Sequence, residues 1–143
     1  MEEVTRAAGL EDHLPTAASL FLDYDQDGDL DIVTFPFQLT PVVWRNEKPA
    51  GPGFEVRLDD RRTANRYGVG ARVRIRSPDG RLQMRDIKAS GGHQSHDLLV
   101  ARFGLGDWPR VSSIEVTWPD GESTEVRADG LGPGRYRLVR RAR

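Results

Sequence analysis

The chain has 143 residues and a formal net charge of −1, so it can bury a core but carries no overall field that would attract nucleic acid or an acidic membrane. It contains no cysteine, which excludes disulfides, thiolate metal sites and a cysteine nucleophile. No run of about 18 apolar residues occurs, so we expect no membrane insertion. The acidic N-terminus is unlike a signal peptide. We expect a cytoplasmic protein if Met1 is the native start, and an extracellular one if the chain was cut from a longer exported protein.

Residues 1–50 contain three predicted strands and one weak helical segment. Val4, Ala7 and Ala8 give residues 2–9 a slight apolar face, and Gly9 can end a short helix there. Strands are predicted at residues 17–22, 31–35 and 41–45. The composition of residues 46–53 is that of a linker, which places a domain boundary near residue 50.

The rest of the chain is a regular series of short predicted strands. In residues 54–58 and 71–76, apolar residues alternate with charged ones, as in half-buried antiparallel strands. Pro78-Asp79-Gly80 and Pro119-Asp120-Gly121 are turn sequences, because proline presets φ and glycine adopts the left-handed conformation. About seven strands with turns every 8–12 residues favour an all-β, antiparallel β-sandwich. The other predicted strands span residues 81–89, 98–103, 114–118, 122–127 and 135–140.

The most unusual stretch runs from Asp23 to Asp31, where five aspartates occur in nine residues. Two like charges about 4 Å apart repel by roughly 4 kcal/mol at an effective dielectric near 20, and a bound cation removes that cost. Alternating aspartates in a tight turn can converge on one point, and Gly28 is expected to supply the positive φ that turns the chain. The stretch therefore predicts a divalent cation site.

The ligand types and their spacing favour Ca²⁺. The helix–loop–helix calcium motif needs a glutamate at position 12, but Thr34 stands there and the flanks are β-strands. Mg²⁺ fits less well because it keeps its waters, and transition metals would favour histidine or cysteine. A solvated acidic turn without an ion is the alternative. Asp29 is expected to offer its backbone carbonyl while its carboxylate faces water, and the expected side-chain ligands are Asp23, Asp25, Asp27 and Asp31.

These motifs resemble two known families. The aspartate stretch between strands, followed by Trp44-Arg45-Asn46, resembles an FG-GAP (VCBS-type) repeat, the calcium-loop blade unit of β-propellers. The second half resembles the ASPIC/UnbV domain through residues 65–73, Ser90-Gly91-Gly92, residues 103–106 and residues 116–121. The resemblance implies a blade-like unit at 1–50, a β-sandwich at 51–143, and a place at the C-terminal end of a cartilage-acidic-protein-like chain.

The chain departs from the family pattern in two places. Proteins of this kind carry several blade repeats, whereas this chain has one aspartate loop, so its blade is expected to leave sheet edges that a second copy can pair with. After Gly92 stands His93-Gln94-Ser95-His96-Asp97, where the family more often has an aromatic residue followed by Ser-Gln. His93, His96 and Asp97 are candidates for an acid–base site, against the simpler interpretation of a polar loop.

Three functions follow from these observations. The first is a binding or scaffold module in which calcium is structural; its ligand, a protein, a glycan or a small molecule, is left open. The second, implied by the resemblance to UnbV-type proteins, is an enzyme or auxiliary protein of an enediyne-type secondary-metabolite pathway, acting near His93 and His96. The third is an extracellular adhesion fragment. The many arginines on alternate strand positions predict a basic face that could bind an anionic glycan or a phosphate group.

Overall fold

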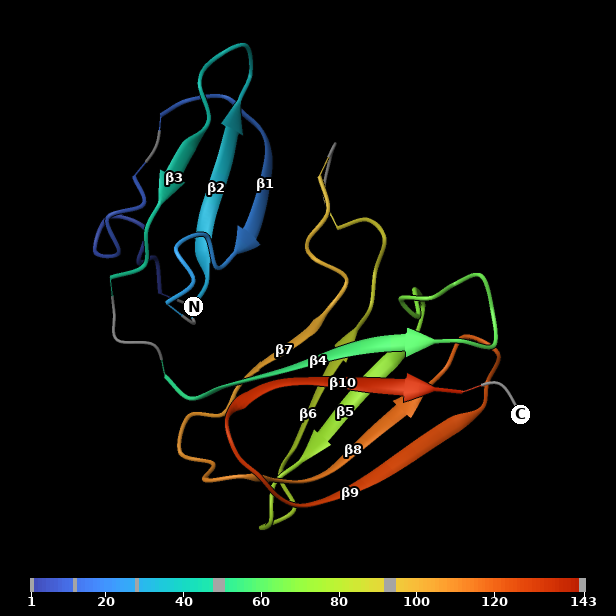
Figure 1. Ribbon diagram of the computed structural model, residues 1–143. Helices are drawn as coiled ribbons and strands as arrows, with labels where there is room; N and C mark the ends of the chain where they lie inside the picture. Colours follow the sequence, from blue (N-terminus) through green and yellow to red (C-terminus); the bar gives the residue numbers. More distant parts are fainter. Residues whose placement is uncertain (1, 12, 28, 48–50, 92–94, 142–143) are drawn as a thin grey trace. The chain divides into compact units, whose positions relative to one another are not determined.

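The computed structural model describes residues 2–11, 13–27, 29–47, 51–91 and 95–141. Its contacts divide the chain into two units, each described by itself (Figure 1). The first comprises Met1–Lys48 and Ser90–Asp97, and the second comprises Pro49–Ala89 and Leu98–Arg143. The domain assignment 1–50 and 51–143 stays a prediction, because a division by contacts does not test whether either part folds alone.

The first unit is built on a three-stranded antiparallel meander. Strand β1 (Thr16–Leu22) pairs with β2 (Asp31–Pro36), and β2 pairs with β3 (Val42–Trp44). The Nε1–H of Trp44 donates to the Thr34 hydroxyl oxygen at 3.2 Å, which ties β3 to β2 through side chains as well as backbone. The loop between β1 and β2 contains the aspartate stretch.

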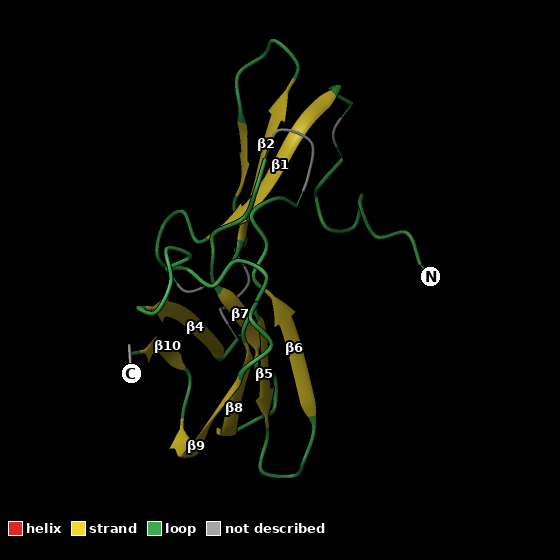
Figure 2. Cartoon of the chain, turned by 90° about the vertical axis from the view of Figure 1, so that its right-hand side faces the viewer, coloured by secondary structure: helices red, strands yellow, loops and turns green. Residues whose placement is uncertain are grey.

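The expected helix over residues 2–9 does not form. The backbone N–H of Ala8 donates to the carbonyl of Val4 at 2.8 Å, but the segment is a turn that stops at Gly9, which has φ 72°. Two alanines and one valine bury too little apolar surface to offset the cost of nucleating a helix. The described residues contain strands, turns and loops but no helix (Figure 2).

The second unit contains two sheets. One has the strand order β10-β4-β7, and the other has the order β6-β5-β8-β9. The strands are β4 (Gly53–Asp60), β5 (Arg72–Arg76), β6 (Leu82–Asp86), β7 (Ala101–Gly104), β8 (Val111–Thr117), β9 (Ser123–Leu131) and β10 (Gly134–Arg140). The fold class predicted from the alternating pattern, an all-β protein with a β-sandwich, is confirmed, and no closed barrel forms among the described strands.

One strand pair differs from the antiparallel expectation. β10 runs parallel to β4, with Arg137 opposite Arg57 and Leu138 opposite Leu58. The other pairs in both sheets are antiparallel. β10 returns from the opposite sheet, so its direction follows from the path of the chain between layers and not from a local hairpin turn.

The core of the second unit lies between these two sheets. The alternation in β4 sends Phe54, Val56 and Leu58 inward, and Trp118 is buried among the side chains of the opposite layer. The ring of Phe54 stacks on that of Tyr136 with centroids 4.7 Å apart. Other apolar side chains of this core are also fully buried, namely Phe103, Ile75, Ile87, Leu105, Val73, Val111 and Val116.

Gly68 is needed where the chain passes close to this core. Its φ is +64°, and an added Cβ would lie 2.8 Å from Cδ1 of Leu58. Both the conformation and the space therefore require glycine.

No helix in the described part of the chain is long and apolar enough to span a membrane.

Candidate metal centre

The aspartate loop is closed by the last pair of the β1–β2 ladder, Leu22 opposite Asp31. Gln26 adopts a positive φ of 63°, so the left-handed turn expected from glycine is made at least in part by glutamine. Gly28, to which the sequence assigned that role, lies outside the described residues. The backbone N–H of Asp27 donates to the Asp25 carboxylate at 3.4 Å, and that of Asp29 donates to the Asp27 carboxylate at 3.2 Å. These local bonds curl the loop.

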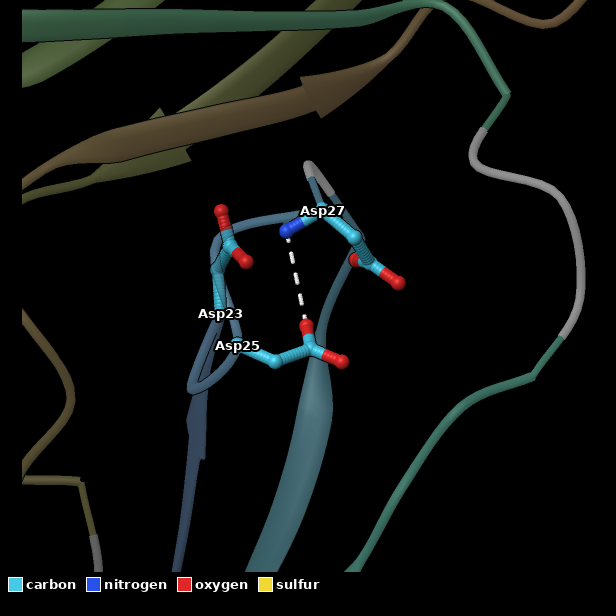
Figure 3. A group of neighbouring side chains, drawn as sticks. All are labelled: Asp23, Asp25 and Asp27. Carbon is cyan, nitrogen blue, oxygen red and sulfur yellow. Dashed lines mark hydrogen bonds between the residues drawn. The ribbon is translucent and has the colours of Figure 1, made fainter.

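Three of the predicted ligands are brought together. One carboxylate oxygen each of Asp23, Asp25 and Asp27 lies within 4.8 Å of the others (Figure 3). Figure 3 also shows the hydrogen bond from the Asp27 backbone to the Asp25 carboxylate, which holds successive side chains of the loop close together. The donor set is made of oxygen atoms alone, as hard cations prefer.

Asp31 is not one of these three residues, and its hydrogen bonds hold the loop in place. It is 1% exposed, and its carboxylate accepts the backbone N–H of Tyr24 at 3.0 Å and that of Asn46 at 2.8 Å. These two hydrogen bonds lower the pKa of the Asp31 carboxyl. The expected ligand role of Asp31 stays a prediction, and the geometry gives the residue a clear structural role in joining the loop to the end of β3.

Asp29 is placed differently from the sequence expectation. Its carboxylate was expected to face water, and this is wrong: both oxygens are closed off from solvent and have no hydrogen-bond partner among the described residues. Burial raises the pKa of the Asp29 carboxyl, and the negative charges of the neighbouring aspartates raise it further. A buried carboxylate without a donor is costly unless something positive compensates it.

Arg45 is the residue of this centre that sequence reasoning left unassigned. Its Nε lies 2.8 Å from a carboxylate oxygen of Asp25. The Trp44-Arg45-Asn46 motif could have indicated this contact, because the motif follows the loop in the sequence and Asn46 also contacts the loop through its backbone N–H. The end of β3 thus supplies one cation to a loop that carries five carboxylates.

The histidine segment lies beside β1 of the same unit. The Ser95 hydroxyl donates to the Ser19 carbonyl at 2.8 Å, and the Asp97 carboxylate accepts the Phe21 backbone N–H at 3.0 Å. The exposed His96 ring contacts the Asp97 carbonyl through Nδ1 at 3.1 Å. His93 lies outside the described residues. The contacts of Asp97 attach the segment to the sheet, and the catalytic hypothesis for His93, His96 and Asp97 stays a prediction.

Comparison with known proteins shows the family to which the chain belongs. A sequence model of the family described as ASPIC and UnbV matches residues 61–133, just over half of the chain. The chain belongs to the ASPIC and UnbV family. It is 29% identical over 125 residues to cartilage acidic protein 1 of Homo sapiens, which covers 85% of this chain and 19% of that protein. The corresponding proteins of Mus musculus and Xenopus tropicalis are 29% and 28% identical. The chain spans about a fifth of the length of these curated relatives.

Proposed function

We propose that this chain is a calcium-stabilised binding module, in which an FG-GAP (VCBS-type) loop holds the ion and the ASPIC and UnbV domain is the scaffold that presents a binding surface. The observation that carries the calcium proposal is the pair of Asp29 carboxylate oxygens, which are closed off from solvent without a hydrogen-bond donor. They belong to the same loop as the three converging carboxylates. A cation in the loop would compensate this charge.

The chemistry of the loop favours Ca²⁺ over other ions. Asp23, Asp25 and Asp27 would supply side-chain oxygens from one short segment, and no nitrogen or sulfur ligand joins the group within the described part of the chain. Ca²⁺ accepts six to eight oxygens in flexible geometry, whereas Mg²⁺ demands a near-ideal octahedron and retains water. The Arg45 guanidinium on Asp25 partly fills the role of a cation, so the loop is expected to bind calcium weakly.

The ion's proposed role is structural. Because the carboxylates converge only when the loop is folded, calcium binds the native state and stabilises it by mass action. A bound ion would hold β1 and β2 together at the end where Asp31 already joins the loop to β3.

Thermal unfolding of the intact chain tests this proposal. With calcium at about 100 times its dissociation constant, the folded state gains about 2.7 kcal/mol, which for a small unit raises the melting midpoint by roughly 10–20 °C over that in chelator. Asp27→Asn should lose most of this response. Glu11→Gln, which removes an exposed acid of the same unit, should retain it.

Three results would contradict calcium binding. One is an equal midpoint in calcium and in chelator. Another is an equal response to calcium in the Asp27→Asn and wild-type chains. The third is a larger response to Mg²⁺ than to Ca²⁺ at matched ionic strength, which would assign the loop to the smaller ion.

A further inference from the structure

The outer surface of the β10-β4-β7 sheet carries a concentration of arginines that the calcium loop does not explain. Phe54, Val56 and Leu58 of the central strand β4 point into the core, so Glu55, Arg57 and Asp59 point outward. Register places the flanking strands' arginines on the same side. We call this surface the arginine face, and it is formed by Glu55, Arg57, Asp59, Arg61, Arg66, Arg102, Arg135 and Arg137.

The two acids of the arginine face lie beneath its arginines. Glu55 is 6% exposed and Asp59 is 3% exposed. Glu55 accepts hydrogen bonds from Nε of Arg57 at 2.7 Å and Nε of Arg102 at 3.0 Å. The Asp59 carboxylate contacts three guanidiniums, those of Arg61, Arg66 and Arg137, at 3.0, 2.7 and 2.8 Å.

The arrangement leaves positive charge on the outside. Glu55 and Asp59 are contacted by five arginines, Arg57, Arg61, Arg66, Arg102 and Arg137, so these contacts hold three more positive than negative charges, in a chain whose net charge is −1. The side chains of Arg57, Arg61, Arg66 and Arg137 are 51–63% exposed. On the other sheet, Arg72 pairs with Asp86 and Arg74 pairs with Glu115, so each of these two arginines has an acid of its own.

The exposed guanidiniums have donors left for a ligand. Each carries five N–H donors in a planar fork that matches sulfate, phosphate or carboxylate oxygens. Within the described part of the chain, Arg57 and Arg61 donate to their carboxylates through Nε alone. Their terminal nitrogens are therefore available to an anion approaching from solvent.

The spacing of the charges fits an extended anion better than a small one. Arg57 and Arg137 are register partners on adjacent strands, which lie about 4.8 Å apart. Arg135 and Arg61 extend the row along the strand direction, in which same-side residues repeat every ~7 Å. A single sulfate would contact one pair of arginines, whereas a polymer with a charge every few ångströms would contact the whole row.

We propose that the arginine face binds a linear sulfated polysaccharide. Sulfate groups suit the guanidinium forks, and a repeating polymer suits the row. The strand positions of the face carry no aromatic side chain on which nucleic-acid bases would stack. This inference names a partner class for the binding-module role proposed above and rests on that role, but the surface lies wholly within the second unit and does not involve calcium.

Titration of the intact chain with a heparin dodecasaccharide tests the proposal. Arg57→Gln combined with Arg137→Gln should weaken binding about tenfold, which is about 1.4 kcal/mol. Glu55 keeps Arg102 and Asp59 keeps Arg61 and Arg66 in that variant, so a thermal melt should show that it folds. The matched control, Arg72→Gln with Arg74→Gln, makes the same charge change on the other sheet and should bind as the wild type does.

Each other outcome would overturn the inference. If heparin does not bind, sulfated polysaccharides are excluded as ligands. If the control pair loses as much heparin affinity, the binding is general electrostatic attraction and not recognition by the arginine face. Single-stranded DNA of equal charge competing as well as heparin would favour a nucleic-acid surface, and inorganic sulfate competing at the same affinity would favour a small-anion site. Repeating the titration in calcium and in chelator keeps the two proposals apart, because heparin binding should be equal in both even if the calcium proposal fails.

Discussion

The aspartate loop of the first unit and the arginine face of the second both hold carboxylates away from water, but their compensating charges come from different sources. On the arginine face, Asp59 has three guanidinium partners, and all of them belong to the chain. In the loop, the Asp29 carboxylate has no hydrogen-bond donor among the described residues, and the neighbouring aspartates surround it with further negative charge. The stability of the loop should therefore depend on ions in solution, whereas that of the sandwich should depend on the protonation of its own acids.

The largest expected effect comes from breaking the internal compensation of the sandwich. The Arg140 side chain is 4% exposed, lies over the Trp118 ring at 4.9 Å, and contacts the buried Asp60 at 3.2 Å. Arg140→Met should cost about 3–5 kcal/mol in the free energy of unfolding, because Asp60 then keeps a buried charge without its cation. Urea unfolding measures this cost. Arg72→Met, which removes an exposed ion pair with Asp86, should cost at most about 1 kcal/mol. Equal costs for the two variants would contradict the expected difference between a buried and an exposed ion pair.

The second prediction concerns acid. The hydrogen bond from Arg66 lowers the pKa of Asp59 to about 2, although burial opposes it. The unfolded pKa is about 3.9, so the stabilisation by Asp59 is complete above about pH 5 and is lost as the pH falls towards 2. The stability difference between wild type and Asp59→Asn should shrink over that range in denaturant titrations. The difference for Glu125→Gln, an exposed acid of the other sheet, should be smaller above about pH 5, where the contribution of Asp59 is complete.

The third and smallest effect has the opposite sign. Because burial and neighbouring charges raise the pKa of Asp29, its ionised form destabilises the calcium-free loop at neutral pH. In chelator, Asp29→Asn should therefore stabilise strands β1 and β2, as measured by hydrogen exchange of their amides. The gain should shrink as the pH falls through the raised pKa of Asp29, because the wild type then takes up the proton itself. A variant less stable than the wild type in chelator would contradict this account.

The fold was largely predictable because its signals are local. Alternation in residues 54–58 and 71–76 identified strands and the face each buries, since that period follows from the pleat. The parallel pairing of β10 with β4 was not predictable, because it depends on where the chain returns between layers. The buried contact between Arg140 and Asp60 joins residues 80 positions apart and has no local signal.

The candidate metal centre was predictable in composition and less so in geometry. The spacing of Asp23, Asp25 and Asp27 predicted a convergence that the structure contains. The burial of Asp29 and the backbone contacts of Asp31 depend on the path of the loop and on the end of β3, which lies outside the stretch itself. Counting positions within a loop cannot say which carboxylate will face solvent.

The segment Ser90–Asp97 has a consequence for the order of folding during synthesis. It follows β6 of the second unit, yet Ser95 and Asp97 bond to the backbone of β1. The three strands of the first unit have all been synthesised once Trp44 is complete. That unit must nevertheless wait for some fifty further residues to emerge from the ribosome before its last hydrogen bonds can form, and β4, β5 and β6 emerge during that interval.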